Sequence, residues 1–248
     1  MQPDPLSTAA QALRSADSVL VITGAGISAE SGIPTFRGEG GLWEGFRAED
    51  LASMPGFQAS PERVWRWYQW RRSLCLEASP HEGHRVIAQM DAHYTRFLLA
   101  TQNIDDLHPQ AGNSRIVELH GNIHQGMCTQ CGASETLGSP TPEEDAPLPE
   151  CSRCGGLLRP RVLWFGESYW PGILEEAGDF ALTAEVVLVV GTSGMVWTPI
   201  AIALAARRAG AMLIDVNPEA GAVPEVDCWL EGKAGEVLPS LWEKIQSG

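Results

Sequence analysis

The chain has 248 residues and 44% of them are hydrophobic, so it can bury a full core, and general disorder is excluded. Its 17 Lys and Arg residues against 31 Asp and Glu residues give a formal net charge of −14, which repels phosphate backbones and argues against a nucleic-acid-binding protein. The first residues lack the features of a secretory signal, and no apolar run approaches the ~20 residues of a membrane span. We therefore expect a cytoplasmic protein that does not bind membranes.

Short runs of β-branched and aliphatic residues predict buried strands, with helical segments between them. Strands that alternate with helices form a parallel sheet that helices cover on both faces, so the pattern predicts an α/β fold. The predicted strands are 19–22, 96–101, 186–190 and 211–216.

Pairs of a hydroxyl residue and a proline predict three helix starts, because Ser and Thr are good N-caps and Pro is favoured at the first helical position. The third pair predicts the last helix, over 199–209, which Gly210 ends. Two stretches interrupt the pattern: 38–56 is a glycine-rich loop with short helices, and 134–149 is a Pro-rich exposed excursion. The pairs are Ser60-Pro61, Ser79-Pro80 and Thr198-Pro199.

Two glycine turns follow predicted strands. Residues 24–29 fit the pattern G-x-G-x-x-A, which lets a backbone turn approach a pyrophosphate, although a tight turn without a ligand explains this hexapeptide equally well. The second turn, 191–194, is followed by a strand that ends at Asn217, where a polar side chain can hold a ribose hydroxyl. Two such turns in one chain favour a bound dinucleotide over a pair of ordinary strand ends.

Four of the six cysteines stand in two Cys-x-x-Cys pairs, which are typical of thiolate knuckles. Four thiolates suit tetrahedral Zn²⁺ and leave no open position, so we predict one structural zinc ion. Two disulfides or redox pairs are the alternative, which an intracellular chain disfavours. Cys75 and Cys228 are expected to be small core residues. The predicted ligands are Cys128, Cys131, Cys151 and Cys154.

Polar residues follow the strand 96–101, at the edge where open α/β sheets bind ligands: Gln102, Asn103 and Asp105. Further along the chain His120 precedes a glycine, but a single histidine is more often structural than catalytic. The same structural interpretation applies to the other histidines, which are His81, His84, His93, His108 and His124.

Taken in order, these motifs resemble the sirtuins, the NAD-dependent protein deacylases. The resemblance rests on 24–28, 32–37, 101–105, His120-Gly121 and the four cysteines, and it spans about 7–241. The chain resembles a minimal, bacterial-type member of this family. The resemblance implies a Rossmann-like large domain, formed by 1–37, 81–122 and 160–248, and a small domain formed by a helical module, 38–80, and a zinc-binding module, 123–159.

The resemblance also implies roles for single residues. His120 is expected to be the general base, and 162–167 to pair with the substrate peptide as an added strand, through Val162, Phe165, Gly166 and Glu167. Asp106 stands where the family commonly has Asn. The residues expected to bind NAD are Gly24, Ala25, Gly26, Phe36, Arg37, Gln102, Asn103, Asp105, Gly191, Thr192, Ser193, Asn217, Lys233 and Ala234.

The acyl group is indicated by three further residues. Tyr68 and Arg71 are three apart in the helix after Ser60, so they share a face. In sirtuins of the desuccinylase subgroup, a Tyr-x-x-Arg pair binds an acidic acyl tail, and an alanine sixteen residues upstream, here Ala52, widens the pocket. The alternative is that Arg71, beside Arg72, is solvated surface.

The resemblance therefore implies a monomeric enzyme that removes succinyl, malonyl or glutaryl groups, and to some extent acetyl groups, from lysine in peptides. The products are free lysine, nicotinamide and O-acyl-ADP-ribose. Protein mono-ADP-ribosyltransfer is the alternative activity, and a zinc-ribbon interaction module without turnover is a third interpretation.

Overall fold

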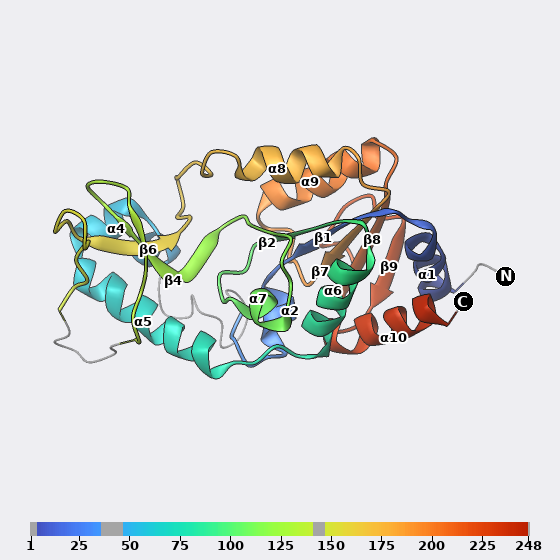
Figure 1. The fold of residues 1–248 in the computed structure, drawn as a ribbon, viewed down its shortest axis with the longest axis horizontal. Coiled ribbons are helices and arrows are strands. Elements are labelled where there is room, and N and C mark those ends of the chain that lie inside the picture. Colours follow the sequence, from blue (N-terminus) through green and yellow to red (C-terminus); the bar gives the residue numbers. More distant parts are fainter. Residues whose placement is uncertain (1–3, 36–46, 141–146, 248) are drawn as a thin grey trace.

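The computed structural model describes residues 4–35, 47–140 and 147–247. Its larger body is built on a six-stranded sheet with the order β3-β2-β1-β7-β8-β9, in which all neighbours are parallel (Figure 1). The strand order reverses between β1 and β7, and such a switch point is where open α/β sheets bind ligands. The strands are β1 (Ser18–Thr23), β2 (Arg96–Thr101), β3 (Ile116–Glu118), β7 (Val186–Val190), β8 (Met212–Asn217) and β9 (Cys228–Glu231).

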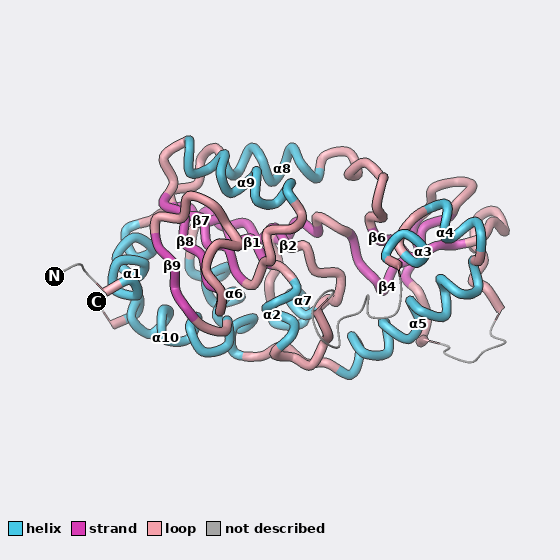
Figure 2. The backbone as a smooth tube through the Cα atoms, turned by 180° about the vertical axis from the view of Figure 1, so that it is seen from behind, coloured by secondary structure: helices cyan, strands magenta, loops and turns pink. Residues whose placement is uncertain are grey.

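Helices cover both faces of this sheet, as the α/β pattern predicted (Figures 1 and 2). Every residue of β1 and β7 is buried, which is why these strands have continuous apolar sequences. We call the two apolar clusters on the two faces the sheet cores. One contains residues of α1 (Pro5–Ser15), α6 (Glu82–His93) and α10 (Ala234–Gln246), and the other contains residues of α8 (Ile173–Ala181) and α9 (Trp197–Arg208).

A small domain lies at the end of the molecule opposite α1 and α10 (Figures 1 and 2). It has an antiparallel sheet of order β5-β4-β6 and a group of helices on the other side of a third core. We call this third cluster the aromatic core, after Phe57, Trp65, Trp67, Tyr68 and Trp164. Its elements are α3 (Ala48–Leu51), α4 (Met54–Ala59), α5 (Pro61–Glu77), β4 (Gly121–Cys128), β5 (Ser134–Thr136) and β6 (Leu158–Val162).

Two short helices, α2 (Ala25–Ala29) and α7 (Leu107–Ala111), follow β1 and β2 and face the region between the two domains (Figure 1). The division into a large sheet domain and a small domain agrees with the predicted fold class. The exact residue boundaries expected for the domains remain a prediction. No helix in the described ranges is both long and apolar enough to span a bilayer.

The helix starts were predicted with mixed success. Ser60 is the N-cap of α5, as expected, but its side chain makes no capping hydrogen bond. However, α6 begins at Glu82, because the side chain of His81 accepts the N–H of Gly83 at 3.0 Å and caps the helix in place of Ser79. Helix α9 begins at Trp197, before the Thr198-Pro199 pair.

The prediction that the last helix is 199–209 was wrong, because α10 follows it. Pro239 lies inside α10 and argues against a helix on propensity alone. The helix forms because Leu238, Leu241 and Ile245 are buried in a sheet core, so tertiary packing outweighs the local penalty.

Candidate functional site

The two glycine turns singled out in the sequence lie against each other at the switch point. The N–H of Gly24 donates to the Val190 carbonyl at 3.0 Å, and the N–H of Gly26 donates to the Gly191 carbonyl at 2.8 Å. A Cβ atom on Gly26 would lie 2.7 Å from that carbonyl oxygen. Glycine is therefore required here by the contact between the turns, before any ligand is considered.

A polar network extends from the first turn, with Ser28 and Asp105 buried and Asn103 half-buried. The Asn103 side-chain amide donates to the Gly24 carbonyl and to Ser28 Oγ, each at 3.0 Å, and Ser28 Oγ donates to Asp105 Oδ2 at 2.6 Å. Asp105 Oδ1 accepts the N–H of Leu107 at 3.0 Å. Burial raises the pKa of Asp105 above its usual range, while the hydrogen bond from Ser28 opposes that shift. Ser28 was absent from the predicted site residues, although its place in the glycine motif was a signal.

His120 lies beside this network with its two ring nitrogens in different environments. Nδ1 is 3.1 Å from the Gln102 carbonyl oxygen, which can only accept, so we assign the proton to Nδ1. Nε2 then carries the lone pair and lies 3.4 Å from the hydroxyl of Tyr169, a residue that the sequence reasoning missed. Burial lowers the pKa of His120, which favours the neutral ring. This arrangement suits a general base.

The second glycine turn is tied to both neighbouring strand ends. Gln102 Nε2 donates to Thr192 Oγ1 at 3.3 Å, and the Asn217 side-chain amide donates to the Thr192 carbonyl at 2.6 Å. Ser193 is exposed on the same turn. Three residues predicted from separate motifs are therefore connected by direct hydrogen bonds.

The start of α10 lies at the same edge of the sheet as the two glycine turns. Both carboxylate oxygens of Glu30, the residue after α2, accept the N–H of Gly235, at 3.0 and 3.2 Å. Lys233 is the exposed N-cap of α10 and Ala234 is its buried first residue. Of the other residues expected to bind the cofactor, Ala25 is the first residue of α2, and Phe36 and Arg37 lie outside the described residues.

Asp106 follows Asp105 in the left-handed region, with φ of 71°, a conformation that Asn and Asp tolerate better than most residues. The Asn122 side-chain amide donates to Asp106 at 3.2 Å and to Glu118 at 2.8 Å, so it bridges the two carboxylates. Burial raises the pKa of Glu118. Asp106 therefore stabilises the turn between the network and α7.

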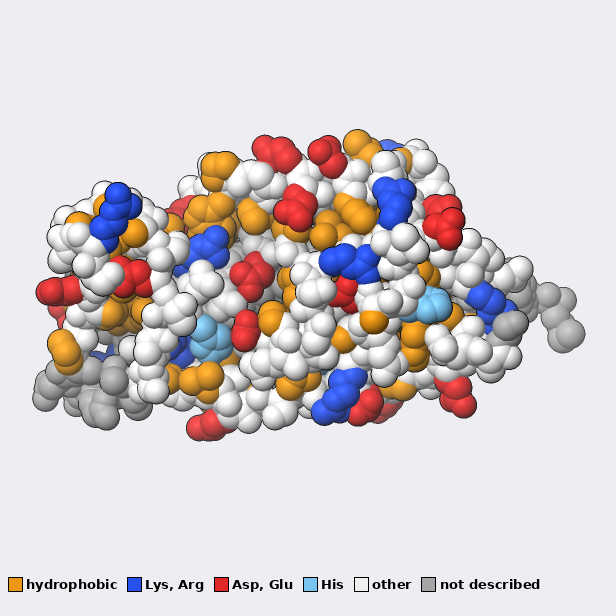
Figure 3. Space-filling view, viewed as in Figure 1, with side chains coloured by type: hydrophobic (Ala, Val, Ile, Leu, Met, Phe, Trp, Pro, Cys, Tyr) orange, Lys and Arg blue, Asp and Glu red, His pale blue; other side chains and the backbone are white. Residues whose placement is uncertain are grey.

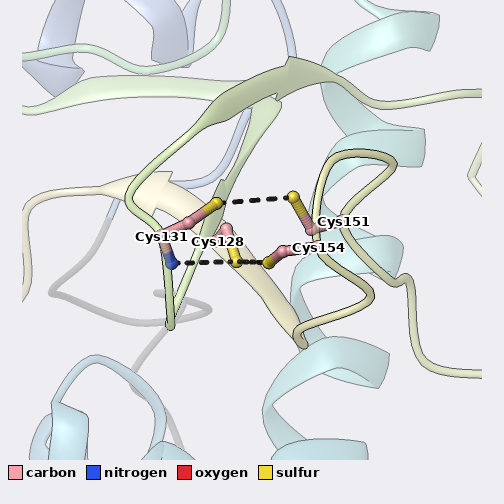
Figure 4. Close-up of side chains that lie close together, drawn as sticks. All are labelled: Cys128, Cys131, Cys151 and Cys154. Atoms are coloured by element: carbon pink, nitrogen blue, oxygen red, sulfur yellow. Dashed lines mark hydrogen bonds between the residues drawn. The ribbon is translucent and has the colours of Figure 1, made fainter.

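The four paired cysteines form one cluster (Figure 4). The Sγ atoms of Cys128 and Cys154 are 3.5 Å apart, and those of Cys131 and Cys151 are 3.7 Å apart. These distances are too long for disulfides and close to the edges of about 3.8 Å that a tetrahedron with Zn–S bonds of about 2.3 Å requires. The donor set and its spacing thus fit one structural zinc ion. Cys75 and Cys228 are buried single residues, as predicted.

The three residues expected at the acyl group are all buried in the aromatic core. Tyr68 is 1% exposed and Arg71 is 5% exposed, so the interpretation of Arg71 as solvated surface was wrong. The Arg71 guanidinium carbon lies 4.8 Å from the centre of the Trp67 ring and 5.7 Å from that of the Tyr68 ring. Ala52 contacts the expected peptide-binding segment, since its carbonyl accepts the N–H of Phe165 at 2.9 Å.

The segment 162–167 also contacts His120, whose carbonyl accepts the N–H of Leu163 at 2.9 Å. Val162 is buried, the Phe165 side chain is 54% exposed, and Gly166 has φ of 83°. The Glu167 carboxylate turns inward: it pairs with the buried Arg159 guanidinium and accepts the N–H of Trp164 at 2.8 Å.

Three of the remaining histidines stack behind the network, with ring centres 4.4 Å apart for His81 and His84 and 4.9 Å apart for His84 and His108. His108 Nε2 lies 3.0 Å from Thr23 Oγ1 at the end of β1. Burial lowers the pKa of His84 to about 2 and that of His108 to about 3. Burial therefore keeps the rings of His84 and His108 neutral, while His81 caps α6.

The face shown in Figure 3 is hollowed near its middle, beneath α8. A cavity of about 400 Å³ lies between β3, α7 and α8, and Glu118, Arg161 and Glu176 are among its lining residues. None of the predicted site residues lines it, so this cavity is separate from the network at the switch point.

Comparisons with known proteins agree with this geometry. Residues 24–198 match the model of the Sir2 family, the family of the sirtuins. The chain is 46% identical to NAD-dependent protein deacylase 2 of Pyrobaculum aerophilum over 96% of this chain and 94% of the relative. It is 43% identical to the NAD-dependent protein deacylase of Aquifex aeolicus over 92% and 95%.

Two solved structures extend the comparison to three dimensions. A crystal structure of a Sir2 homologue–NAD complex matches with a TM-score of 0.90 and 39% identity, over 96% of this chain and 93% of the other. Sir2Af2 bound to a myristoylated histone peptide matches with a TM-score of 0.78 and 31% identity, over 98% and 97%. Sequence, fold and the ordered motifs lead to one conclusion: the chain belongs to the Sir2 family.

Proposed function

We propose that this chain is an NAD-dependent protein deacylase that transfers an acyl group from lysine to ADP-ribose. The observation that carries the proposal is the position of His120: its Nδ1 lies at the Gln102 carbonyl, which assigns the proton to Nδ1 and the lone pair to Nε2, and its ring lies beside the Ser28–Asn103–Asp105 network. The family and the names of its relatives support the same activity.

Each residue has a chemical task in this proposal. NAD, when bound, supplies a neutral leaving group, nicotinamide, and a ribose carbon to which the acyl oxygen can bond. Asn103 and Asp105, which belong to the network at the switch point, have the task of orienting the nicotinamide carboxamide by hydrogen bonds. Nε2 of His120 accepts the proton of a ribose hydroxyl, which prepares that oxygen to take the acyl group. The zinc ion, held by the four cysteines away from this network, is structural.

Nicotinamide release provides the first test. A deacylase releases nicotinamide only when acylated peptide is present, whereas ADP-ribosyl transfer to protein does not require the acyl group. Changing His120→Ala should lower turnover by at least ~10²-fold, because a general base is lost, and should leave peptide binding unchanged. Tyr169→Phe is the matched control, since it keeps the base and removes only the hydroxyl near Nε2. Turnover near that of the wild type in His120→Ala would contradict the assignment.

We further propose that the preferred acyl groups are acidic: succinyl, malonyl or glutaryl. A carboxylate buried in an apolar channel needs a fixed cation and a second donor, and the buried Arg71 and Tyr68 supply this pair of groups. The guanidinium fork of Arg71 can hold both carboxylate oxygens, and Ala52 leaves room beside it. A long apolar acyl chain, such as the myristoyl group bound by the solved relative, has no charge for Arg71 to pair.

The ratio of kcat/KM for succinyl over acetyl peptide tests this preference. Arg71→Met should lower the ratio by roughly 30-fold to several thousandfold, because losing one partner of a buried charge pair costs about 2–5 kcal/mol. Arg72→Met is the matched control: it removes a neighbouring buried guanidinium whose partners are Gln69 and Gly138. The preference is wrong if Arg71→Met leaves the ratio unchanged.

A further inference from the structure

Tyr68 has a hydrogen-bond donor that the structure leaves unused. Its hydroxyl oxygen accepts the indole N–H of Trp164 at 2.8 Å, and both side chains are buried, at 1% and 2% exposure. A phenol oxygen both accepts and donates, so this contact leaves its own proton to be donated elsewhere. No acceptor for that proton is found in the ranges 4–35, 47–140 and 147–247.

The charged side chain of Arg71 cannot serve as the acceptor. The Arg71 guanidinium lies against the Tyr68 ring, and a guanidinium only donates hydrogen bonds. Two donors therefore lie side by side in a buried apolar setting, one charged and one neutral. A carboxylate, which only accepts, can take the Tyr68 proton and is attracted by the Arg71 charge.

The orientation of Trp164 is set by three further contacts. The Arg159 guanidinium stacks 3.6 Å from the centre of the Trp164 ring, and Glu167 pairs with Arg159 while accepting the Trp164 backbone N–H at 2.8 Å. Phe57 packs on the ring with centroids 5.4 Å apart. Because the ring is confined by these contacts, the direction of its N–H is fixed. This direction determines which lone pair of the Tyr68 hydroxyl oxygen accepts the hydrogen bond.

We propose that Trp164 is a positioning residue for acyl selectivity. Its indole N–H occupies a lone pair of the Tyr68 hydroxyl and so directs the hydroxyl proton toward an acyl carboxylate beside Arg71. This inference rests on the proposed preference for acidic acyl groups and names a residue that acts on the acyl group only through Tyr68.

The sharpest variant replaces the indole of Trp164 by benzothiophene, using benzothienylalanine, because sulfur replaces the N–H while the ring shape is kept. Trp164→Phe is a second variant within the natural amino acids. In both, kcat/KM for succinyl over acetyl peptide should fall about threefold to tenfold, the range expected for one hydrogen bond. The additional loss should lie in KM of the succinyl peptide and should exceed any loss with the acetyl peptide.

Trp65 is the matched control, because it is also buried in the aromatic core and its indole N–H donates to a backbone carbonyl, that of Leu158, at 2.8 Å. Benzothienylalanine at position 65 should affect both peptides equally. In a Tyr68→Phe background, the change at Trp164 should no longer alter the ratio, since the group through which it acts is gone.

The outcomes separate this inference from the proposed function. A ratio that falls with Arg71→Met but not with either Trp164 variant overturns the role of Trp164 and leaves the acyl preference standing. Equal losses for both peptides, or an effect that persists in Tyr68→Phe, make Trp164 a structural residue and also overturn the inference. If the wild-type enzyme shows no preference for the succinyl peptide, and Arg71→Met leaves the succinyl-to-acetyl ratio unchanged, both the acyl preference and the role of Trp164 are overturned.

Discussion

The sheet cores and the aromatic core are built by different physical means. The strands at the centre of the sheet cores are aliphatic, and β1 and β7 are buried along their whole length. The aromatic core instead packs large rings around the buried Arg71 and Arg159 and joins the cysteine cluster. The sheet cores are stabilised by the burial of apolar surface, which has no preferred direction. The aromatic core also depends on polar contacts, and each of these requires one particular geometry.

This difference teaches where a single substitution should be most harmful. An aliphatic core tolerates changes that conserve volume, but removing one partner of a buried polar pair leaves the other unsatisfied. The aromatic core should therefore be the more sensitive region. The sheet cores have exceptions of their own, since the carboxyl oxygens of Asp215 and both ring nitrogens of His84 have no hydrogen-bond partner among the described residues.

The largest expected effect comes from zinc removal. Structural zinc sites have apparent binding free energies of roughly 10–16 kcal/mol, so Cys128→Ser should lose the metal and unfold the small domain. Amide hydrogen exchange should show protection lost in β4 and β6 and kept in β1 and β7. Cys75→Ser, at a buried cysteine outside the cluster, should keep one zinc equivalent. Metal-free protein with unchanged protection in β4 would refute the prediction.

The next effect comes from breaking the pair of Arg159 and Glu167. Arg159 is buried and its partner is a quarter exposed, so Arg159→Met leaves a carboxylate in a poorly solvated position. We expect a loss of about 3–5 kcal/mol in the free energy of unfolding, measured in urea. The double variant Arg159→Met with Glu167→Met should be less destabilised than the single one. If the single variant unfolds at the same urea concentration as the wild type, the pair does not stabilise this core.

Asp215 should weaken a sheet core in a pH-dependent way. Burial raises its pKa to about 7, so its carboxyl is neutral in the folded chain at pH values where the unfolded chain has already lost the proton. Stability is therefore lost as pH rises from about 4 to 7, by a total on the order of 4 kcal/mol, and is flat above. Asp215→Asn should remove this dependence. Thermal unfolding at pH 5 and pH 8 measures it, and an equal pH dependence in both proteins would contradict the prediction.

His84 should produce the smallest effect, with the opposite sign. Burial lowers its pKa to about 2, so the unfolded chain binds a proton below pH 6.5 that the folded chain does not. Stability should fall by about 2 kcal/mol between pH 6.5 and 5. His84→Leu should reduce that fall, whereas the exposed His93→Gln should not. The same melting series checks it, and an unchanged acid dependence in His84→Leu would remove His84 as its cause.

The two regions also differ in how far the sequence could predict them. The strands 19–22, 96–101, 186–190 and 211–216 were recognised because full burial requires continuous apolar runs. The second and third match the observed strands, and the other two differ from them by one residue at each end. The small sheet was not predicted, since β4 and β6 are far apart in the chain and their short sequences have no clear alternation. The sequence likewise did not predict the hydrogen bonds that Ser28 makes with Asp105 and Asn103, or the contact between Tyr169 and His120.

By itself, the sequence determined the α/β class, the paired cysteines and the order of the polar motifs, because burial and turn chemistry depend on neighbouring residues. Only the tertiary structure decided that Arg71 is buried rather than solvated, that Glu167 turns inward to Arg159, and that Trp164 donates to Tyr68. Trp164 and Tyr68 are 96 residues apart in the chain. Contacts of this kind have a direction as well as a distance, and no local pattern of residue types specifies the direction in which a distant donor will point.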